Sequence, residues 1–294
     1  MIPGGRRAAA APEHIAEVSA ATFSNAADDE HCIQVMTLNV RRPLGVFTVR
    51  RADRWSGRRV HLARLLRHEA PTVLGAQEVT PGAAKLMQAA LGPTYRFVGH
   101  GRAPGPRGEA CPIFYDSERL ALESWTQRAL SDTPERAGSR SWGNPLPRVV
   151  VDAVFTDLRT GAQLAVVNTH LDPFSERSRI RSARLIREAA AARAEPVIVT
   201  GDFNSAPDSA TARTLHLGGT LRDAWTAAES RASPEWGTHT SYRPPRPGPR
   251  IDWIAVGDGI RVLRAAIGGR RRLEVRASDH LPVRAGLLID GSGP

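Results

Sequence analysis

Residues 196–204 read PVIVTGDFN, where a run of β-branched residues ends in Gly, Asp, Phe and Asn. Val, Ile and Thr favour strands, and a continuous run of them is typical of a strand that is buried on both faces. Asp202 and Asn204 stand where such a strand would end. The stretch therefore predicts a central strand that carries polar side chains to one edge of a sheet.

Similar short apolar runs, separated by longer amphipathic stretches, recur along the rest of the chain. Further strands are predicted at 32–40, 72–78, 110–115, 147–157, 162–171, 250–256, 260–267 and 279–289. Helices are predicted at 54–68, 81–91 and 174–193, the last with Ser175 as its cap. Strands buried on both faces that alternate with amphipathic helices predict an α/β fold with helices outside stacked sheets.

Composition excludes some classes of protein and leaves others open. The 294 residues contain no run of about 18 uncharged apolar residues, so no membrane-spanning segment is expected. The net charge of +10 would suit a nucleic-acid partner. However, 39 of the 40 basic residues are arginines and only Lys85 is lysine, which is typical of a coding bias. The charge alone is therefore no argument for DNA binding.

One domain over 31–290 is the simplest division of the chain, with a flexible leader at 1–30 and a short tail at 291–294. The leader lacks the apolar stretch of about 7–15 residues that a signal peptide requires. Two cysteines cannot build a disulfide framework or a four-thiolate zinc site. We therefore expect a cytoplasmic monomer without structural zinc.

Polar side chains gather at the ends of the predicted strands. They are Asn39, Glu78, Asn168, His170, Asp202, Asn204, Asp279 and His280, with Asp252 early in a further apolar strand. Taken alone, an Asp or Asn at a strand end is more often a turn or a helix cap. Several buried carboxylates near one another cost several kcal/mol each unless a cation or strong hydrogen bonds compensate them.

Carboxylates without thiolates suit a hard ion. Glu78, Asp202 and Asp279 offer oxygen ligands, which favour Mg²⁺, or Mn²⁺ as a substitute, over zinc. The pattern therefore predicts metal-assisted phosphoryl chemistry.

Eight strings occur in an order that resembles a known family. They are MTLNV at 36–40, LGAQEV at 74–79, GEACPIFY at 108–115, LPRVV at 146–150, NTHLD at 168–172, GDFNSAPDS at 201–209, RIDWIAV at 250–256 and SDHLPV at 278–283. Together they resemble the endonuclease/exonuclease/phosphatase family, the DNase I-like metal-dependent phosphoesterases, and most closely its stand-alone bacterial branch. The resemblance implies a four-layer αββα sandwich of two mixed β-sheets flanked by helices.

The resemblance also implies roles for the residues that match. Glu78 would be the main Mg²⁺ ligand, with Asn39 and Asp279 holding the ion or its waters. Asp202 would orient and deprotonate the attacking water, and Asn204 would hold that carboxylate or a phosphate oxygen.

The two matched histidines would act on the phosphate itself. His280, with Asp252 accepting from its other ring nitrogen, would contact the phosphate and shuttle protons. It therefore competes with Asp202 for the role of general base. His170 would pair with Glu109 near a non-bridging or leaving-group oxygen. Asn168 would steady the phosphate beside it.

Three further residues are candidates for substrate contacts. Arg148 offers a guanidinium fork that fits two phosphate oxygens, although a structural pair with an acid is equally open. Arg41 follows a strand end, and Trp142 could stack on a base or sugar or pack in the core. The stretches 95–110 and 131–146 would form the walls of the site.

The function expected first is Mg²⁺-dependent hydrolysis of a phosphodiester, such as DNA or RNA, by in-line attack of water. The alternative is a phosphatase or phosphodiesterase acting on a small-molecule or lipid-linked phosphate ester. A non-catalytic binding protein is disfavoured, because Glu78, Asp202 and His280 are all present. The segment at 236–242, WGTHTSY, matches the family only loosely, and no role is expected for His239.

Overall fold

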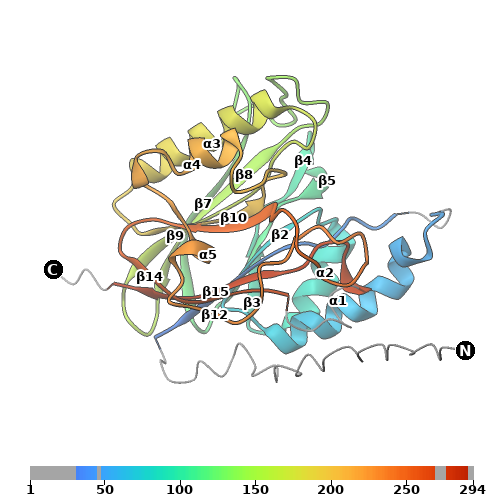
Figure 1. Ribbon diagram of the computed structural model, residues 1–294, viewed down its shortest axis with the longest axis horizontal. Helices are drawn as coiled ribbons and strands as arrows, with labels where there is room; N and C mark the ends of the chain where they lie inside the picture. The colour runs from blue at the N-terminus through green and yellow to red at the C-terminus, as the bar shows by residue number, and fades with distance from the viewer. Residues whose placement is uncertain (1–30, 45–47, 269–275, 291–294) are drawn as a thin grey trace, which may run out of the picture.

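The computed structural model describes residues 31–44, 48–268 and 276–290. The expected leader at 1–30 and tail at 291–294 lie outside the described residues. Two large β-sheets pack face to face, and helices cover both outer faces (Figure 1). The predicted four-layer αββα sandwich is confirmed.

The first sheet, within the described residues, contains seven strands: β1 Ile33–Asn39, β2 Val73–Gln77, β3 Tyr95–Val98, β6 Ile113–Asp116, β12 Ser230–Arg231, β14 Ile260–Ile267 and β15 Val283–Ile289. They lie in the order β12-β14-β15-β1-β2-β6-β3. The pairs β1–β2 and β12–β14 are parallel and the others are antiparallel, so the sheet is mixed.

The second sheet has six strands in the described part of the chain: β7 Leu120–Ala129, β8 Val149–Asp157, β9 Gln163–His170, β10 Val197–Asp202, β11 Arg222–Asp223 and β13 Asp252–Val256. Their order is β11-β13-β10-β9-β8-β7. Only β9 and β10 pair in parallel among these described strands.

Helices and one hairpin complete the described fold: α1 Trp55–Glu69, α2 Pro81–Leu91, α3 Glu176–Ala191, α4 Ala210–Leu215, α5 Ala224–Ala227, and the two-stranded hairpin of β4 Gly101–Ala103 and β5 Arg107–Ala110. Figure 1 shows α1 and α2 on one outer face and α3 and α4 on the other. The predicted cap of α3 is confirmed, because the Ser178 N–H donates to Ser175 Oγ at 3.2 Å. No described helix is both long and apolar enough to cross a membrane.

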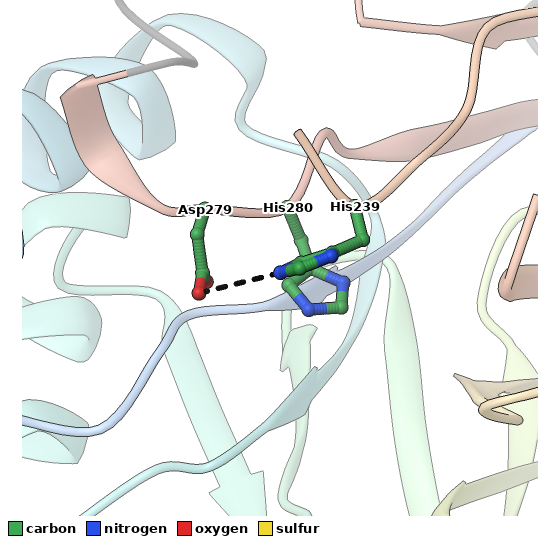
Figure 2. A group of neighbouring side chains, drawn as sticks. All are labelled: His239, Asp279 and His280. Carbon is green, nitrogen blue, oxygen red and sulfur yellow. Dashed lines mark ion pairs between the residues drawn. The ribbon is translucent and has the colours of Figure 1, made fainter. Parts of the chain in front are cut away.

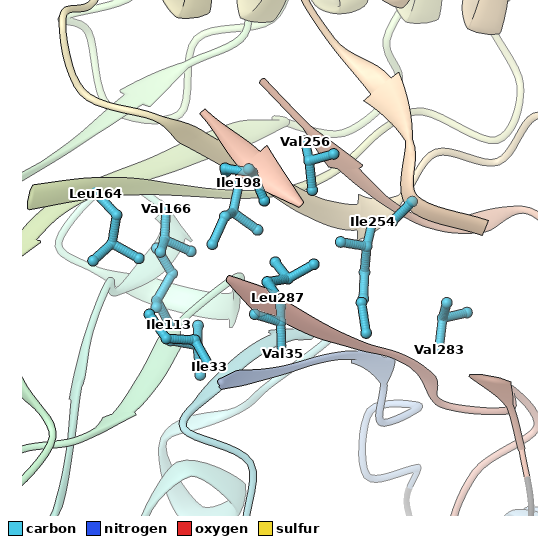
Figure 3. Close-up of a cluster of buried hydrophobic side chains, with 14 of the residues drawn as sticks. Ile33, Val35, Ile113, Leu164, Val166, Ile198, Ile254, Val256, Val283 and Leu287 are labelled. Atoms are coloured by element: carbon cyan, nitrogen blue, oxygen red, sulfur yellow. The ribbon is translucent and has the colours of Figure 1, made fainter. Parts of the chain in front are cut away.

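Side-chain alternation divides the core into three layers. Ile33 and Val35 of β1 face the second sheet, whereas Met36 and Leu38 of the same strand pack toward α1 and α2. This period of two is the geometry of an extended strand. Figure 3 shows the inner layer, where aliphatic side chains of both sheets interdigitate, and a third cluster lies between the second sheet and α3.

All nine predicted strands and all three predicted helices have counterparts in the structure. The described strands and α-helices that were not predicted are β3, β4, β5, β7, β11, β12, α4 and α5, of which β7 is the longest. Four consecutive β7 side chains, at 123–126, are exposed. β7 lies at the edge of its sheet, so half of its side chains face solvent and no continuous apolar run marks it. The wall predicted at 95–110 contains the β4–β5 hairpin.

Strand direction brings the polar strand ends to one edge. β1 and β2 run parallel, as do β9 and β10, so the carboxyl ends within each pair coincide. In register, Asp202 lies beside His170 on one side and beside Asp252 on the other. Because β13 is antiparallel to β10, a residue that begins β13 joins residues that end the other strands.

The two sheets approach each other closely at Gly75. A Cβ atom there would lie 2.0 Å from Thr200 Oγ1 and 2.9 Å from Asn168 Oδ1. The place that a side chain would fill is taken by cross-sheet hydrogen bonds, since Gln77 Nε2 donates to Asn168 Oδ1 at 2.8 Å and Asn168 Nδ2 donates to the Ala76 carbonyl at 2.9 Å.

We predict that Gly75→Ala lowers the free energy of unfolding by about 1–3 kcal/mol, the usual cost of overpacking a core. Urea denaturation measures it. Gly57→Ala is the control, because nothing lies within 4 Å of a Cβ at that position of α1. The control should leave stability unchanged or raise it by up to about 1 kcal/mol. Equal unfolding midpoints for both variants would contradict the close approach.

Candidate active site

Asp202, at the end of β10, is the centre of the polar cluster. Its side chain is buried, and Asn39 Nδ2 and the Asn204 N–H each donate to one of its carboxylate oxygens at 2.9 Å. Its Oδ2 lies 3.7 Å from His170 Nε2 and 3.9 Å from His280 Nε2. One carboxylate therefore touches groups from both sheets.

The neighbouring carboxylates of Asp202 and Asp252 both lie close to the ring of His280. Burial and the charge of Asp252 raise the pKa of Asp202. His280 Nδ1 donates to Asp252 Oδ2 at 2.8 Å, which is the predicted partnership. Burial alone would lower the pKa of His280, but the charges of Asp252, Asp202 and Asp279 and the hydrogen bond to Asp252 raise it to about 10. The neighbouring carboxylates therefore favour the protonated form of His280.

The pKa of His170 is shifted in the opposite direction, downward. Burial, with the charges of Arg148 and Arg102, lowers its pKa to about 4 despite the nearby carboxylates. The predicted pair with Glu109 is not formed. Glu109 instead lies 3.1 Å from Arg42 Nη1 and 2.7 Å from Arg102 Nη2, because permanently charged guanidinium groups attract a carboxylate more strongly than a neutral imidazole does.

The predicted metal ligands offer two ionised carboxylates and an amide. Burial alone would raise the pKa of Glu78, but the neighbouring His170 ring and hydrogen bonds from the Arg42 N–H and Asn39 Nδ2 lower it. Burial also opposes the low pKa of Asp279, which the nearby His239, His280 and Arg41 bring to about 2. Such an oxygen donor set fits a hard divalent cation.

Arg41 lies next to these carboxylates. Its Nε is 3.3 Å from Asp53 Oδ1 and 3.6 Å from Asp279 Oδ2. Burial works against a high pKa, yet the charges of Asp279, Glu78 and Asp53 raise the pKa of Arg41. Asp53 and Asp279 therefore hold the guanidinium group of Arg41 at the site, and the Arg41 side chain is 31% exposed.

His239 joins the site although the sequence predicted no role for it. Its Nε2 lies 3.7 Å from Asp279 Oδ2, and its ring centroid lies 4.8 Å from that of His280 (Figure 2). The Thr240 N–H donates to the Asp279 carbonyl at 2.7 Å and fixes this loop. Two groups of side chains could hold a metal ion here: His239 with Asp279 and His280, and Asp202 with Asp252 and His280.

Three residues that the sequence did not mark as functional, Asp53, Arg58 and Tyr242, fix the loops of the site. Buried Arg58 of α1 donates to five backbone carbonyls, those of Val40, Arg41, Arg42, Asp53 and Ala277. Asp53 accepts a hydrogen bond from the Tyr242 hydroxyl at 2.6 Å. Nothing in the local sequence distinguishes these residues from ordinary surface arginines, aspartates and tyrosines.

The two predicted asparagines hold the backbone in place. Asn168 Nδ2 donates to three carbonyls, one in β2 and two in the segment just before β6, and its Oδ1 accepts from Gln77 and Thr200. Its amide hydrogens are therefore already bound to protein, which contradicts the expected contact with phosphate. Asn204 Nδ2 donates to the Leu171 carbonyl at 3.0 Å, so its backbone N–H, and not its side chain, holds Asp202.

Arg148 and Trp142 lie in different surroundings. Arg148 is 3% exposed, and its Nε forms the structural pair with an acid, Asp172, at 3.3 Å, while its Nη1 has no partner among the described residues. Trp142 Nε1 donates to Asp132, and the ring lines a cavity of about 750 Å³ between α3 and the strands β7 and β8. None of the predicted catalytic side chains in the described part of the chain lines that cavity, so Trp142 is not brought to the carboxylates.

Backbone strain is concentrated around the carboxylates. Five non-glycine residues there have φ between 49° and 66°: Arg41, Glu78, Asn204, Ser241 and Tyr242. Each such residue costs roughly 1–3 kcal/mol and is commonly found at functional sites. The strained backbone turns each chain segment sharply where a strand or loop reaches the site.

Comparison with known proteins places this geometry in one family. The model of the Endonuclease/Exonuclease/phosphatase family matches residues 36–280. No curated protein matches the chain.

Solved structures match nearly the whole fold. A family protein from Bacteroides thetaiotaomicron is 27% identical with a TM-score of 0.81, over 89% of this chain and 96% of that chain. A mannosyl-6-phosphatase from the same organism is also 27% identical, with a TM-score of 0.79, over 87% and 99%. D. rerio TDP2, complexed with a single-strand DNA product, is 17% identical with a TM-score of 0.66, over 88% and 99%, and shares the fold.

We predict that Asp252→Asn lowers the pKa of His280 from about 10 toward the ordinary value, because it removes the nearest negative charge. NMR titration of the histidine ring measures it. A histidine with a raised pKa in the folded state stabilises the fold fully below its unfolded pKa. That stabilisation is lost as the pH rises through the folded pKa. Asp258→Asn, an exposed site, is the control, and an unchanged His280 titration in Asp252→Asn would refute the pairing.

Proposed function

The chain belongs to the endonuclease/exonuclease/phosphatase family, whose members are hydrolases of phosphate esters, and we propose that it cleaves its ester by Mg²⁺-assisted in-line attack of water. The catalytic domain would span 31–290. One observation carries the proposal: the buried carboxylate of Asp202 lies 3.7 Å from His170 Nε2 and 3.9 Å from His280 Nε2, and shares the Asn39 amide with Glu78.

Glu78 and Asp279 would hold the metal, with Asn39 steadying Glu78 through a hydrogen bond of 3.1 Å. Their oxygens suit Mg²⁺, with Mn²⁺ as a substitute. The triad of His239, Asp279 and His280 suits it less, because His280 would first have to give up its proton. The bound ion would neutralise charge on the phosphate as the reaction proceeds.

Asp202 would act as the general base. A carboxylate with a raised pKa accepts a proton more readily, and two N–H groups hold Asp202 in one orientation. The carboxylates around His280 raise its pKa to about 10, which makes it the weaker candidate to accept the proton from water. It would instead donate from Nε2 to a non-bridging oxygen, with Asp252 holding the ring.

The remaining residues would position the reacting groups. Neutral His170 would donate to a phosphate oxygen, and Asn204 would orient the general base through its backbone. Glu109 would hold arginines at the site in place of the histidine pairing first expected. Asn168 would fix the separation of the two sheets.

The ester that is cleaved could be a phosphodiester or a phosphate monoester. The sequence favoured a phosphodiester, and TDP2 shows that this fold accommodates DNA, although at 17% identity only the fold is shared. The mannosyl-6-phosphatase is 27% identical over almost its full length. That similarity favours the alternative, a monoester of a small molecule.

Hydrolysis of supercoiled plasmid DNA, 4-nitrophenyl phosphate and bis(4-nitrophenyl) phosphate tests the reaction. Each is measured with Mg²⁺, with EDTA, and with Asp202→Ala. Asp258→Ala, which removes an exposed aspartate after β13, is the matched control. We expect hydrolysis that requires both the metal and Asp202 and survives the control substitution. Hydrolysis that persists in Asp202→Ala would refute the assigned site.

We predict that Glu78→Ala lowers turnover by at least about a hundredfold and raises the Mg²⁺ concentration for half-maximal rate, because the ion contributes several kcal/mol of charge stabilisation. Metal titration of the rate, with circular dichroism to confirm folding, measures it. Glu118→Ala, at an exposed turn, should behave as the unsubstituted protein. An unchanged metal titration in Glu78→Ala would exclude it as a ligand.

A further inference from the structure

The β4–β5 hairpin brings charged side chains to the catalytic edge. Val79, which follows Glu78, exchanges two backbone hydrogen bonds with Ala110 at the end of β5, at 3.1 and 2.8 Å. The hairpin is therefore attached directly beside a proposed metal ligand. Arg102 lies on β4 and Glu109 on β5.

Glu109 orients two arginines. Its two oxygens lie 3.1 Å from Arg42 Nη1 and 2.7 Å from Arg102 Nη2. The side chains of Arg102 and Glu109 are only 11% and 12% exposed. A guanidinium group has five N–H donors in a planar fork, so one carboxylate leaves donors of both arginines free for an anion.

A third arginine lies close to them with an incomplete set of partners. Arg148 is 97% buried and pairs with Asp172 through Nε, but its Nη1 has no hydrogen-bond partner among the described residues. A buried charged N–H without an acceptor costs free energy. Arg148 directly precedes β8, where Val150 pairs with Thr169, the residue before His170, so its side chain starts from the same edge as the proposed active site. Burial and the charge of Arg102 lower the pKa of Arg148.

We propose that Arg102 and Arg148 bind the terminal oxygens of the scissile phosphate and that the substrate is therefore a phosphate monoester. The inference rests on the proposed function. A monoester has three terminal oxygens and a charge near −2 at neutral pH, whereas a diester has two such oxygens and a charge of −1. In a diester, an uncharged ester oxygen and its carbon substituent would lie beside these buried guanidinium groups.

The reaction balances without any further reagent. The oxygen of one water forms a bond to phosphorus as the bond from phosphorus to the ester oxygen breaks. The proton of the water goes to Asp202, and the leaving alkoxide takes a proton from solvent. The products are an alcohol and inorganic phosphate, which would remain on Arg102 and Arg148 until released.

Arg102→Gln tests the inference, with Arg107→Gln as its matched control. Arg107 is an exposed arginine of the same hairpin, so both variants lose the same charge. The measurement is kcat/KM for 4-nitrophenyl phosphate and for bis(4-nitrophenyl) phosphate at one Mg²⁺ concentration. We expect the monoester to be preferred. Arg102→Gln should lower its kcat/KM by about ten- to a hundredfold, the effect of losing one charge-assisted hydrogen bond, and should affect the diester far less.

Binding of inorganic phosphate gives a readout without turnover. Calorimetric titration of the full chain should show weaker phosphate binding in Arg102→Gln and unchanged binding in Arg107→Gln. Equal affinities in all three proteins would overturn the inference. Preference for the diester or for plasmid DNA would also overturn it while leaving the proposed function intact. Hydrolysis that does not depend on Asp202 would instead refute the proposed function.

Discussion

Buried amide side chains fasten the two sheets to each other at the catalytic edge. Asn39 of the first sheet donates to Asp202 of the second, and Gln77 donates to Asn168 in the same way. Buried polar groups are tolerated only when they are bonded, so these contacts form only when the sheets meet in this alignment. The fold and the site therefore depend on the same few hydrogen bonds, and a shift of one sheet would undo both.

The site shifts the pKa values of its two histidines in opposite directions. Burial disfavours the charged form of both rings. At His280 the hydrogen bond to Asp252 and the neighbouring carboxylates outweigh burial and raise the pKa. At His170 burial, with the charges of Arg148 and Arg102, outweighs the nearby carboxylates and lowers the pKa. Asp202 lies between these two rings.

The strand ends that carry the chemistry could be predicted because apolar runs show where strands stop. Parallel pairing then accounts for the convergence of Asp202 and His170. Partnerships between loops were not predictable in this way: the pairing expected for Glu109 was wrong, and Arg58 gave no local signal. Such contacts depend on how distant segments meet in space, which periodicity and motif order do not encode.

Left-handed backbone at five non-glycine positions has a consequence for attempts to make this protein more heat-resistant. Glycine at those positions would relieve the strain, yet it would remove side chains such as Glu78 that the site requires. Stability and catalysis therefore compete along this edge, as they do in many enzymes. Substitutions that raise the melting temperature are better sought on α1, α3 and the outer loops, where backbone geometry and chemistry make no opposing demands.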